Sequence, residues 1–449
     1  MGNLLEHKKG RLAAFFALYV SEGLPQGFTG VALALEFKRM GMEAAALGTF
    51  AATIMLPWSW KFLMGPFVDN LHFRRFGARK QWIVGSQIGM LLSLLLAMAY
   101  FPKMEGGTIV GLGLFTVLLI VHNVFAATQD VAIDGLACTT LEEHERGLAN
   151  GLMFAGAQLG AAIGGSGVLF LKESLGFSMA SMMVPVLLLG VLLMVVFWIC
   201  EKKLNAEEGE MAELRGWKYT VAEVGGYLKE VGKTFFLSKQ GFLGLCLALL
   251  PVGGMALSLV VSTILTPTLG MKDDEIALMG LVASIVFIVF CMTGGYLSDK
   301  IGRKKALAIF GLGTLLPTLW MGWRLQSEGW IYPTAGNGDG TWPRHDGLIR
   351  AWWMASIVYS CFQGLMYGVR TAFFMDIVNP KISATHFTAC MALINVVTMY
   401  CYWWQGQAMT ATGKGGWGFT YFQVFLLDAA LGAFFVFLLP FLKIRQSSE

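Results

Sequence analysis

Several acidic side chains lie inside long apolar stretches of the sequence, and three of them are candidates for binding protons. Asp130 and Asp134 are four residues apart, so they share one face of a helix. Two carboxylates on one face repel each other, which favours proton uptake by one of them. Glu22 lies near the middle of another apolar stretch. Charges in such stretches are costly and usually functional, so we expect proton binding at all three acids.

Lys61 is a basic residue in a similar position, eight residues or roughly 12 Å of helix before Asp69. We expect it to form a charge pair with Asp130, although its side chain could instead extend towards the lipid headgroups. The three acids also have structural alternatives. Asp134 could cap a helix end, Asp130 could serve only to neutralise Lys61, and Glu22 could bond to a neighbouring helix.

Polar and aromatic side chains on the same helix faces are candidates for binding a solute. Arg370 stands out because an arginine can bind a carboxylate or phosphate through two hydrogen bonds. Arg370 could instead form a gating charge pair with Asp376 or with an acid of the first half of the chain. Tyr400 and Trp404 share a face and could stack on a ring, although aromatic residues are also common at membrane surfaces. The candidate substrate-binding residues are Glu22, Gln26, Asn123, Gln129, Gln363, Tyr367, Arg370, Tyr400 and Trp404.

No motif of an enzyme or metal site accompanies these residues. The seven cysteines have no CxxC spacing, and the chain contains neither GxSxG nor HExxH. We therefore expect no metal, no cofactor and no enzymatic activity.

The composition places these charges in a membrane protein. Hydrophobic residues make up 56% of the 449 residues and charged residues only 14%, against about 25% charged in soluble domains. This excludes a soluble globular protein, a disordered chain and a nucleic-acid binder.

Twelve apolar runs are long enough to cross a bilayer. Lys and Arg total 22 in the connections predicted on one side and 9 on the other, counting Arg350 at the start of the tenth span, which puts both termini in the cytoplasm. The predicted spans are 12–36, 44–67, 82–101, 108–137, 147–171, 179–200, 241–267, 276–297, 306–323, 349–378, 387–411 and 419–442.

The sequence also repeats weakly. LPQGF at 24–28 matches LPVGG at 250–254, and the stretch ending at Asp69 matches the one ending at Asp299. Parallel repeats of this kind are typical of transporters. We expect two pseudosymmetric six-helix halves, 1–200 and 241–449, joined by a cytoplasmic linker at 201–240.

One loop carries a family signature. The stretch Gly294-Gly295-Tyr296-Leu297-Ser298-Asp299-Lys300-Ile301-Gly302-Arg303-Lys304-Lys305 resembles the G-x-L-x-D-x-x-G-R-[KR] loop of the major facilitator superfamily. A looser copy follows Gly65. The resemblance implies the twelve-helix fold of that superfamily. It also implies conformational gating by Asp69, Arg79, Asp299, Arg303 and Lys304.

Three further stretches resemble one branch of the superfamily. They are the GLPQG turn at 23–27, the KFLMGPFVD segment at 61–69, and the ATQDVAID segment at 127–134 with its later ERG. This branch contains muropeptide permeases of the AmpG type, acetyl-CoA transporters and siderophore importers.

The resemblance implies proton-coupled import of a small amphipathic or sugar-containing solute, with a peptidoglycan-derived muropeptide as the first candidate. Siderophore import and acyl-CoA transport are alternatives, and a transporter-like sensor is an alternative of another class. We expect a monomer in the cytoplasmic (inner) membrane, whose partners are the lipid bilayer, the solute and protons.

Overall fold

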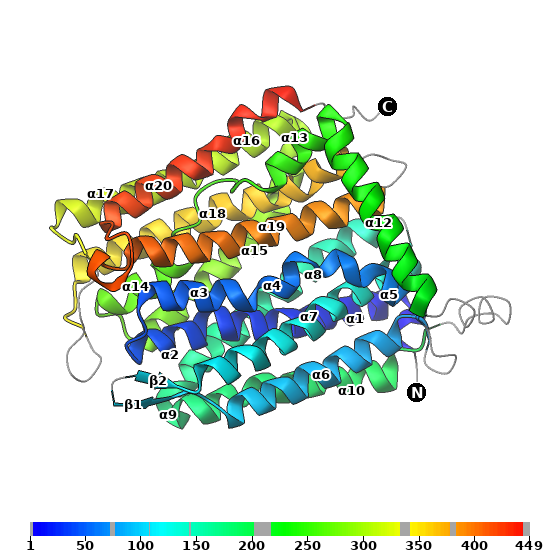
Figure 1. Cartoon of the computed structure of the whole chain (residues 1–449), viewed down its shortest axis with the longest axis horizontal. Helices are drawn as coiled ribbons and strands as arrows, with labels where there is room; N and C mark the ends of the chain where they lie inside the picture. Colours follow the sequence, from blue (N-terminus) through cyan, green and yellow to red (C-terminus); the bar gives the residue numbers. More distant parts are fainter. Residues whose placement is uncertain are drawn as a thin grey trace. The chain divides into compact units, whose positions relative to one another are not determined.

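The computed structural model describes residues 3–71, 77–106, 108–142, 145–201, 217–332, 342–377 and 383–442. Each of the twelve predicted spans coincides with helical structure in these residues, and the all-helical class is confirmed (Figure 1). Most of the predicted linker, 202–216, lies outside the described residues.

The chain forms two compact units. Unit 1 contains Met1–Phe28 and Ile54–Val231, and unit 2 contains Thr29–Thr53 and Gly232–Glu449. Residues 29–53, which belong to the first two predicted spans, thus pack with unit 2. The division into halves at 201–240 stays a prediction.

Unit 1 is built mainly from eight helices of the described residues. They are α1 (Lys8–Gly27), α4 (Leu56–Ser59), α5 (Gly65–Asn70), α6 (Lys80–Ala99), α7 (Leu112–Thr140), α8 (Arg146–Ala162), α9 (Val168–Ser181) and α10 (Met183–Trp198).

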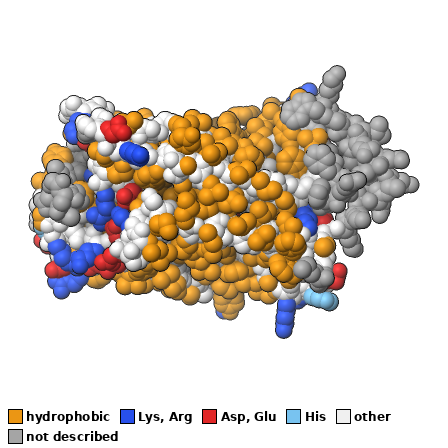
Figure 2. Space-filling view, turned by 90° about the horizontal axis from the view of Figure 1, so that it is seen from below, with side chains coloured by type: hydrophobic (Ala, Val, Ile, Leu, Met, Phe, Trp, Pro, Cys, Tyr) orange, Lys and Arg blue, Asp and Glu red, His pale blue; other side chains and the backbone are white. Residues whose placement is uncertain are grey.

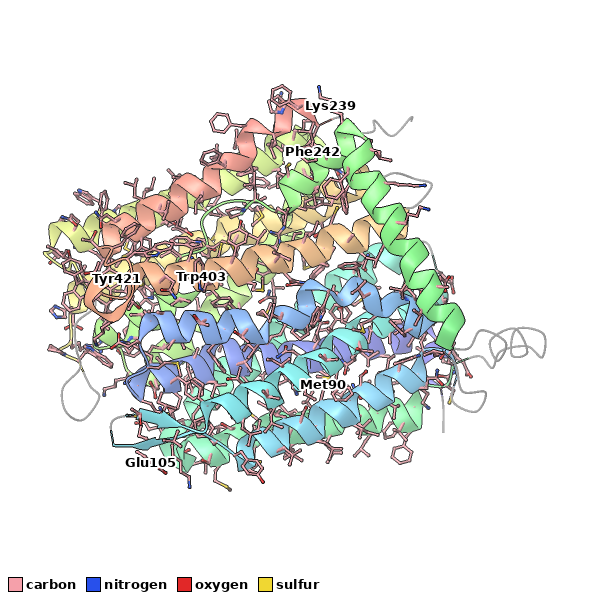
Figure 3. The ribbon with its side chains drawn as sticks, in the orientation of Figure 1. Met90, Glu105, Lys239, Phe242, Trp403 and Tyr421 are labelled. Atoms are coloured by element: carbon pink, nitrogen blue, oxygen red, sulfur yellow. The ribbon has the colours of Figure 1, made fainter. Side chains whose placement is uncertain are left out.

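Unit 1 also contains a hairpin that the sequence did not predict. Strand β1 (Lys103–Glu105) pairs antiparallel with β2 (Thr108–Val110), and Figure 3 labels Glu105 there. The predicted start of the fourth span, at residue 108, was therefore wrong. Gly111 follows β2 with a φ of 87°, a left-handed conformation that ends the strand before α7 begins.

Unit 2 holds the remaining helices of the described residues; Figure 3 labels Lys239 and Phe242 at the start of its α13. They are α2 (Ala34–Arg39), α3 (Ala44–Ile54, ending at the unit boundary), α13 (Lys239–Ala248), α14 (Val260–Thr268), α15 (Asp273–Ile301), α16 (Arg303–Gly313), α17 (Leu315–Ser327), α18 (Asp346–Ile377), α19 (Ser383–Met409) and α20 (Tyr421–Ala433). A linker helix, α12 (Trp217–Leu237), crosses the boundary between the units.

Among the described residues, six helical stretches are long and apolar enough by themselves to cross a membrane. They are Lys80–Ala99, Leu112–Thr140, Leu148–Ser181, Asp273–Ile301, Arg303–Ser327 and Tyr421–Phe441. On the face drawn in Figure 2, hydrophobic side chains cover a broad band, while charged side chains gather towards its ends. Such a band is suited to contact with lipid tails.

Several predicted spans are interrupted rather than continuous, among them the first, the second and the seventh. In the first, a π-helical turn (Phe28–Leu33) follows Pro25. In the second, Pro57 is the second residue of the short α4 and a 3-10 turn covers Lys61–Met64. The seventh is unwound over residues 249–259, between α13 and α14. Proline cannot supply the amide proton that a continuous helix needs, and interruptions at membrane depth are tolerated where they line a site.

Helices α1 and α8 pack backbone against backbone, and this contact fixes one wall of unit 1. A Cβ atom at Gly164, just beyond the end of α8, would lie 1.9 Å from the carbonyl oxygen of Leu24. One at Gly23 of α1 would lie equally close to the carbonyl oxygen of Ala157. Only glycine permits such an approach, as is common between membrane helices.

Candidate functional site

Unit 1 contains a buried ion pair between its second and fourth spans. The Nζ of Lys61 is 2.6 Å from Oδ2 of Asp130, and their side chains are only 15% and 5% exposed. The proline-interrupted second span places Lys61 in its 3-10 turn, facing α7. The ring of Trp58 also lies 5.8 Å from the Lys61 nitrogen. This is the pairing that the sequence favoured over extension towards the headgroups.

Glu22 lies beside this pair, and Asp130, Lys61 and Asp134 are the charged groups that act on it. The side chain is buried, and its Oε1 accepts a long hydrogen bond of 3.4 Å from the exposed Gln26. Its Oε2 has no hydrogen-bond partner among the described residues. Glu22 is therefore the incompletely satisfied acid of the cluster.

Asp134 occupies a different environment from Asp130. It is exposed, and its Oδ1 accepts a 2.6 Å hydrogen bond from the hydroxyl of Tyr19. Because α7 continues to Thr140, Asp134 lies within the helix and does not cap its end. The two acids therefore differ in burial and in partner.

Asn123 and Gln129 both make hydrogen bonds inside unit 1. The Oδ1 of Asn123 accepts from the indole nitrogen of Trp58 at 2.7 Å, which orients the ring beside Lys61. The fully buried Gln129 donates to Ser21 of α1 at 3.1 Å. Asn123 thus supports the ion pair, Gln129 ties α7 to α1, and substrate contact by either stays a prediction.

Unit 2 carries the other polar face that the sequence singled out. Tyr367 and Arg370 lie on α18, with the guanidinium carbon 4.1 Å from the centre of the Tyr367 ring. Gln363, one turn before Tyr367, donates to the hydroxyl of Tyr359 at 3.1 Å. The side chain of Asp376, the alternative partner of Arg370, lies outside the described residues.

The two aromatic candidates of α19 differ in accessibility. Tyr400 is partly buried and donates a 2.9 Å hydrogen bond to the carbonyl of Leu249, at the end of α13. Trp404 is only 6% exposed, so its ring is packed inside unit 2 in this structure. Trp403, its neighbour labelled in Figure 3, is 46% exposed.

The predicted gating residues form pairs within each unit. Asp69 forms an ion pair with Arg79, whose guanidinium also donates to the carbonyl of Val68 at 3.0 Å. Asp299 pairs with Arg303 at 3.6 Å and is 66% exposed.

The second of these pairs is also tied to α18, because Arg303 donates to the carbonyl of Ala372 at 2.9 Å. The half-buried Lys304 lies next to it in the chain. Both copies of the loop thus hold an acid–arginine pair.

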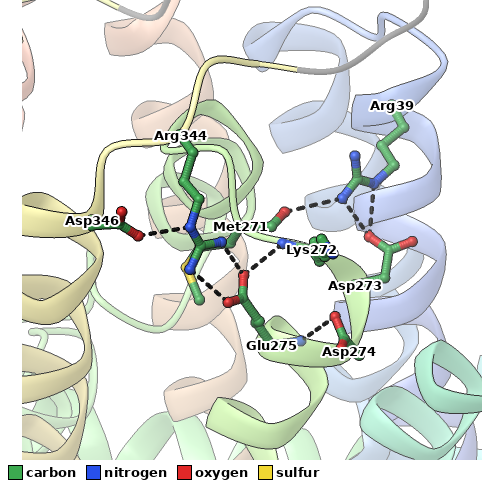
Figure 4. Close-up of polar contacts among 8 residues, drawn as sticks. All are labelled: Arg39, Met271, Lys272, Asp273, Asp274, Glu275, Arg344 and Asp346. Atoms are coloured by element: carbon green, nitrogen blue, oxygen red, sulfur yellow. Dashed lines mark hydrogen bonds and ion pairs between the residues drawn. The ribbon is translucent and has the colours of Figure 1, made fainter.

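A polar network at one end of unit 2 was not predicted from the sequence (Figure 4). Arg39, at the end of α2, donates to Asp273 of α15 at 2.8 Å and to the carbonyl of Met271 at 3.4 Å. Arg344 forms two 2.7 Å bonds to Glu275 and a third to Asp346. These carboxylates hold the pKa of Arg344 above its ordinary value.

Two further contacts lie near this network. Glu43 forms an ion pair with Lys414, and the amide of Ala45 donates to the hydroxyl of Thr410 at 2.8 Å. Opposite charges far apart in the sequence carry no local signal, so only the tertiary structure reveals these partners.

A buried ion pair near the N-terminus was also missed. Arg11 makes two hydrogen bonds to Glu145, of 3.0 and 2.8 Å, and the side chain of Glu145 is 1% exposed. A second acid, Glu142, contacts the same guanidinium at 2.9 Å. The ERG loop after α7 is therefore held against the start of α1.

Comparison with known families decides what kind of protein carries these sites. The sequence profile described as "Major Facilitator Superfamily" matches residues 12–323. The chain belongs to the major facilitator superfamily. It is a multi-pass inner-membrane transporter of a small molecule, built on the twelve-helix fold of this superfamily, and not an enzyme.

Two curated relatives refine the resemblance. The chain is 27% identical over 316 residues to transporter AmpG 4 of Rickettsia conorii, which covers 69% of this chain and 72% of that protein. It is 25% identical over 405 residues to the anhydromuropeptide permease of Escherichia coli K12, and this match covers 87% of this chain and 72% of that protein. The resemblance to AmpG-type permeases predicted from the sequence is confirmed.

Solved structures agree on the fold. The inward-open xylose transporter XylE of E. coli has a TM-score of 0.68 at 13% identity, with 98% of both chains covered. A POT family transporter in complex with 5-aminolevulinic acid has a TM-score of 0.67 at 10% identity, covering 97% of this chain and 96% of that one. At such low identity these similarities concern the fold alone.

Proposed function

We propose that this transporter imports a muropeptide derived from peptidoglycan and is driven by protons. The permease relatives supply the substrate class. The single observation that carries the coupling is the buried Lys61–Asp130 pair beside a Glu22 oxygen that lacks a partner. Buried carboxylates with incomplete hydrogen bonding are suited to carrying a proton, because the neutral form removes the cost of the charge.

The coupling follows from competition for Asp130. While Lys61 contacts Asp130, the negative charge of this acid is compensated and the carboxylate binds a proton only weakly. When helix movement separates the two, the uncompensated carboxylate takes up a proton. Glu22, which interacts with both residues, exchanges protons with the same cluster. Binding and release of a proton are thereby tied to conformation.

The proposal includes an orientation and a monomer as the functional unit. Both termini lie in the cytoplasm, as the distribution of Lys and Arg indicates. Residues 39–43 and 271–275 then face the periplasm. Asp69, Asp299 and the basic residues that follow them face the cytoplasm.

Counterflow in proteoliposomes tests the proposal. Vesicles preloaded with unlabelled muropeptide should take up labelled muropeptide, and an imposed proton gradient should drive accumulation that a protonophore abolishes. Exchange of a siderophore or an acyl-CoA but not of muropeptide would refute the substrate. Binding without any flux would favour the sensor.

In the proposed orientation, Arg39–Asp273 and Glu43–Lys414 lie at the periplasmic end. They join the ends of the first two spans to α15 and to the segment after α19. Backbones also meet there, since a Cβ atom at Gly48 would lie 2.4 Å from the carbonyl oxygen of Tyr402. We assign these contacts to a seal that closes the periplasmic side.

Reversing the charges of one pair should reveal this seal. We expect Arg39→Asp to slow uptake several-fold, since an ion pair of this exposure contributes about 1 kcal/mol and becomes a repulsion. Asp273→Arg should also slow uptake, and the double variant should recover most of the rate. Initial uptake rates in proteoliposomes measure this.

A matched control uses the partly exposed pair Arg324–Glu328 at the end of α17. Reversing the charge of either residue, or of both, should leave the uptake rate within twofold of wild type. If the Arg39→Asp/Asp273→Arg double variant is as slow as the slower single variant, the pair does not form the seal.

Asp299 is expected to act on conformational cycling and not on substrate binding. It is exposed at the end of α15 and pairs with Arg303, which contacts α18. Asp299→Asn should slow transport several-fold while equilibrium affinity stays within a few-fold, because the loss of a surface pair shifts a conformational equilibrium modestly. Parallel measurements of uptake rate and binding affinity check this, and a large affinity loss with normal cycling would contradict it.

A further inference from the structure

Unit 2 contains a small pocket beside the unwound part of the seventh span. Its walls come from residues 251–255 and from α18 and α19. The polar side chains lining it belong to Tyr359, Gln363, Tyr367, Arg370 and Thr398. None of the described residues lining it is acidic, so Arg370 gives the pocket a net positive charge.

Arg370 is a buried cation without a counter-ion among the described residues. It is 9% exposed, and its Nε has no hydrogen-bond partner there. The Tyr367 ring, 4.1 Å away, covers one face of the guanidinium and leaves its edge for a ligand. A buried charge without a partner is costly, so its retention points to an anion that arrives with the substrate.

The surroundings of Arg370 favour a carboxylate over a phosphate. One guanidinium matches a single negative charge and binds two carboxylate oxygens through parallel hydrogen bonds. A phosphate dianion would need a second cation, and the lining residues include none. The lining also includes the apolar side chains of Met255, Met366, Ile394 and Val397, which suit an organic body attached to the carboxylate.

The hydroxyl of Tyr359 is not free to replace Arg370 as the anchor. It donates to the carbonyl of Gly254 at 2.9 Å and accepts a hydrogen bond from Gln363. Of the described groups in the pocket, Arg370 is thus the cationic donor left for an anion.

The unwound segment is held in place by Asp428 of α20. One oxygen of this buried carboxylate accepts from the amides of Met255 and Ala256, at 2.8 and 3.0 Å. The hydroxyl of Thr314 accepts from the amide of Gly254 at 2.8 Å. Asp428 is therefore a positioning residue that fixes the pocket wall at Met255.

We propose that this pocket binds a carboxylate of the transported solute at Arg370 and makes the transporter select acids over their amides. The inference rests on the proposed function, since it names the part of the muropeptide that docks in unit 2. The peptide of a muropeptide carries such carboxylates, and its attached chain would extend out of the pocket.

Paired ligands test this on the purified full-length protein. The probes are an anhydromuropeptide with free carboxylates and the same molecule fully amidated, with affinity measured by calorimetry. We expect wild type to prefer the acid by about ten- to a hundredfold. Arg370→Gln should bind both forms equally and weakly, and Arg370→Lys should keep part of the preference.

The control is Arg324→Gln, which removes a positive charge of unit 2 outside the pocket and should keep the wild-type preference. Thermal unfolding is a second measurement. Arg370→Gln should leave the Tm unchanged or raised, because an unpaired buried charge is removed. An unchanged acid preference in Arg370→Gln, or a strongly lowered Tm, would overturn the proposal.

A smaller pair of probes separates this inference from the proposed function. They are an N-acetylated dipeptide acid and its amide. If the dipeptide acid binds through Arg370 and neither muropeptide form binds, the substrate is wrong and the pocket assignment stands. If the muropeptides bind without regard to Arg370, the pocket assignment is wrong and the substrate stands. Tighter binding of a phosphonate analogue than of the carboxylate would also refute the choice of ligand.

Discussion

Asp130→Asn is expected to abolish uphill accumulation of substrate while leaving some downhill exchange at neutral pH. The variant removes the acid that both pairs with Lys61 and carries the proton, so a proton gradient can no longer drive the cycle. Glu22→Gln should reduce accumulation less completely, because Asp130 remains. The steady-state ratio of internal to external substrate under an imposed proton gradient measures both effects.

A folding control is needed, because Asp130→Asn leaves Lys61 as an unpaired buried charge. Breaking a buried pair on one side costs about 3–5 kcal/mol, whereas replacing both partners is often neutral. The double variant Lys61→Met/Asp130→Asn should therefore fold like wild type and still fail to accumulate substrate.

Asp274→Asn serves as the matched control, since this acid accepts only a local hydrogen bond at the start of α15. The Asp274→Asn variant should accumulate substrate to the wild-type level. The proton mechanism is wrong if Asp130→Asn still accumulates substrate against a gradient.

Gly164→Val should prevent formation of folded protein. Its Cβ atom would lie 1.9 Å from the carbonyl oxygen of Leu24, and backbone cannot move aside as a flexible side chain can. Separating α1 from the segment after α8 would open the wall that holds Glu22. We expect a cost above about 4 kcal/mol. The yield of monodisperse protein after detergent extraction, with its Tm, measures the loss.

Gly190→Val in α10 is the matched control. A Cβ atom there meets nothing within 4 Å, and the residue is exposed on an apolar helix. It should behave like wild type in yield and Tm. Near-normal yield of Gly164→Val would mean that α1 and α8 are less closely packed than described.

Membrane class and the positions of the spans were determined by the sequence itself. Apolar runs must be about 20 residues long to cross lipid, and this requirement is local, so it can be read without the fold. The gating loop at Asp299 was recognisable for the same reason, because its residues are adjacent in the chain. Lys61 and Asp130 could be paired in advance because few buried charges were available as partners.

The interruption of a span could not be predicted from the sequence, because residues distant in the chain stabilise it. Span seven reads as continuous from 241 to 267, yet Asp428 and Thr314 accept the amide protons that its unwound segment cannot bond internally. Proline and glycine there permit an interruption but do not require one. No local pattern around Asp428 indicates which segment it supports.

The environment of each charge was likewise decided only by tertiary structure. Arg39 and Asp273 lie 234 residues apart, and no local pattern joins them. Arg370 was identifiable as a charge in a span, but its lack of a counter-ion among the described residues depends on how α18 is turned within unit 2. Pairing and burial depend on how packed helices are rotated and how closely they approach. Glycines such as Gly23 and Gly164 set that approach, because they let backbones touch.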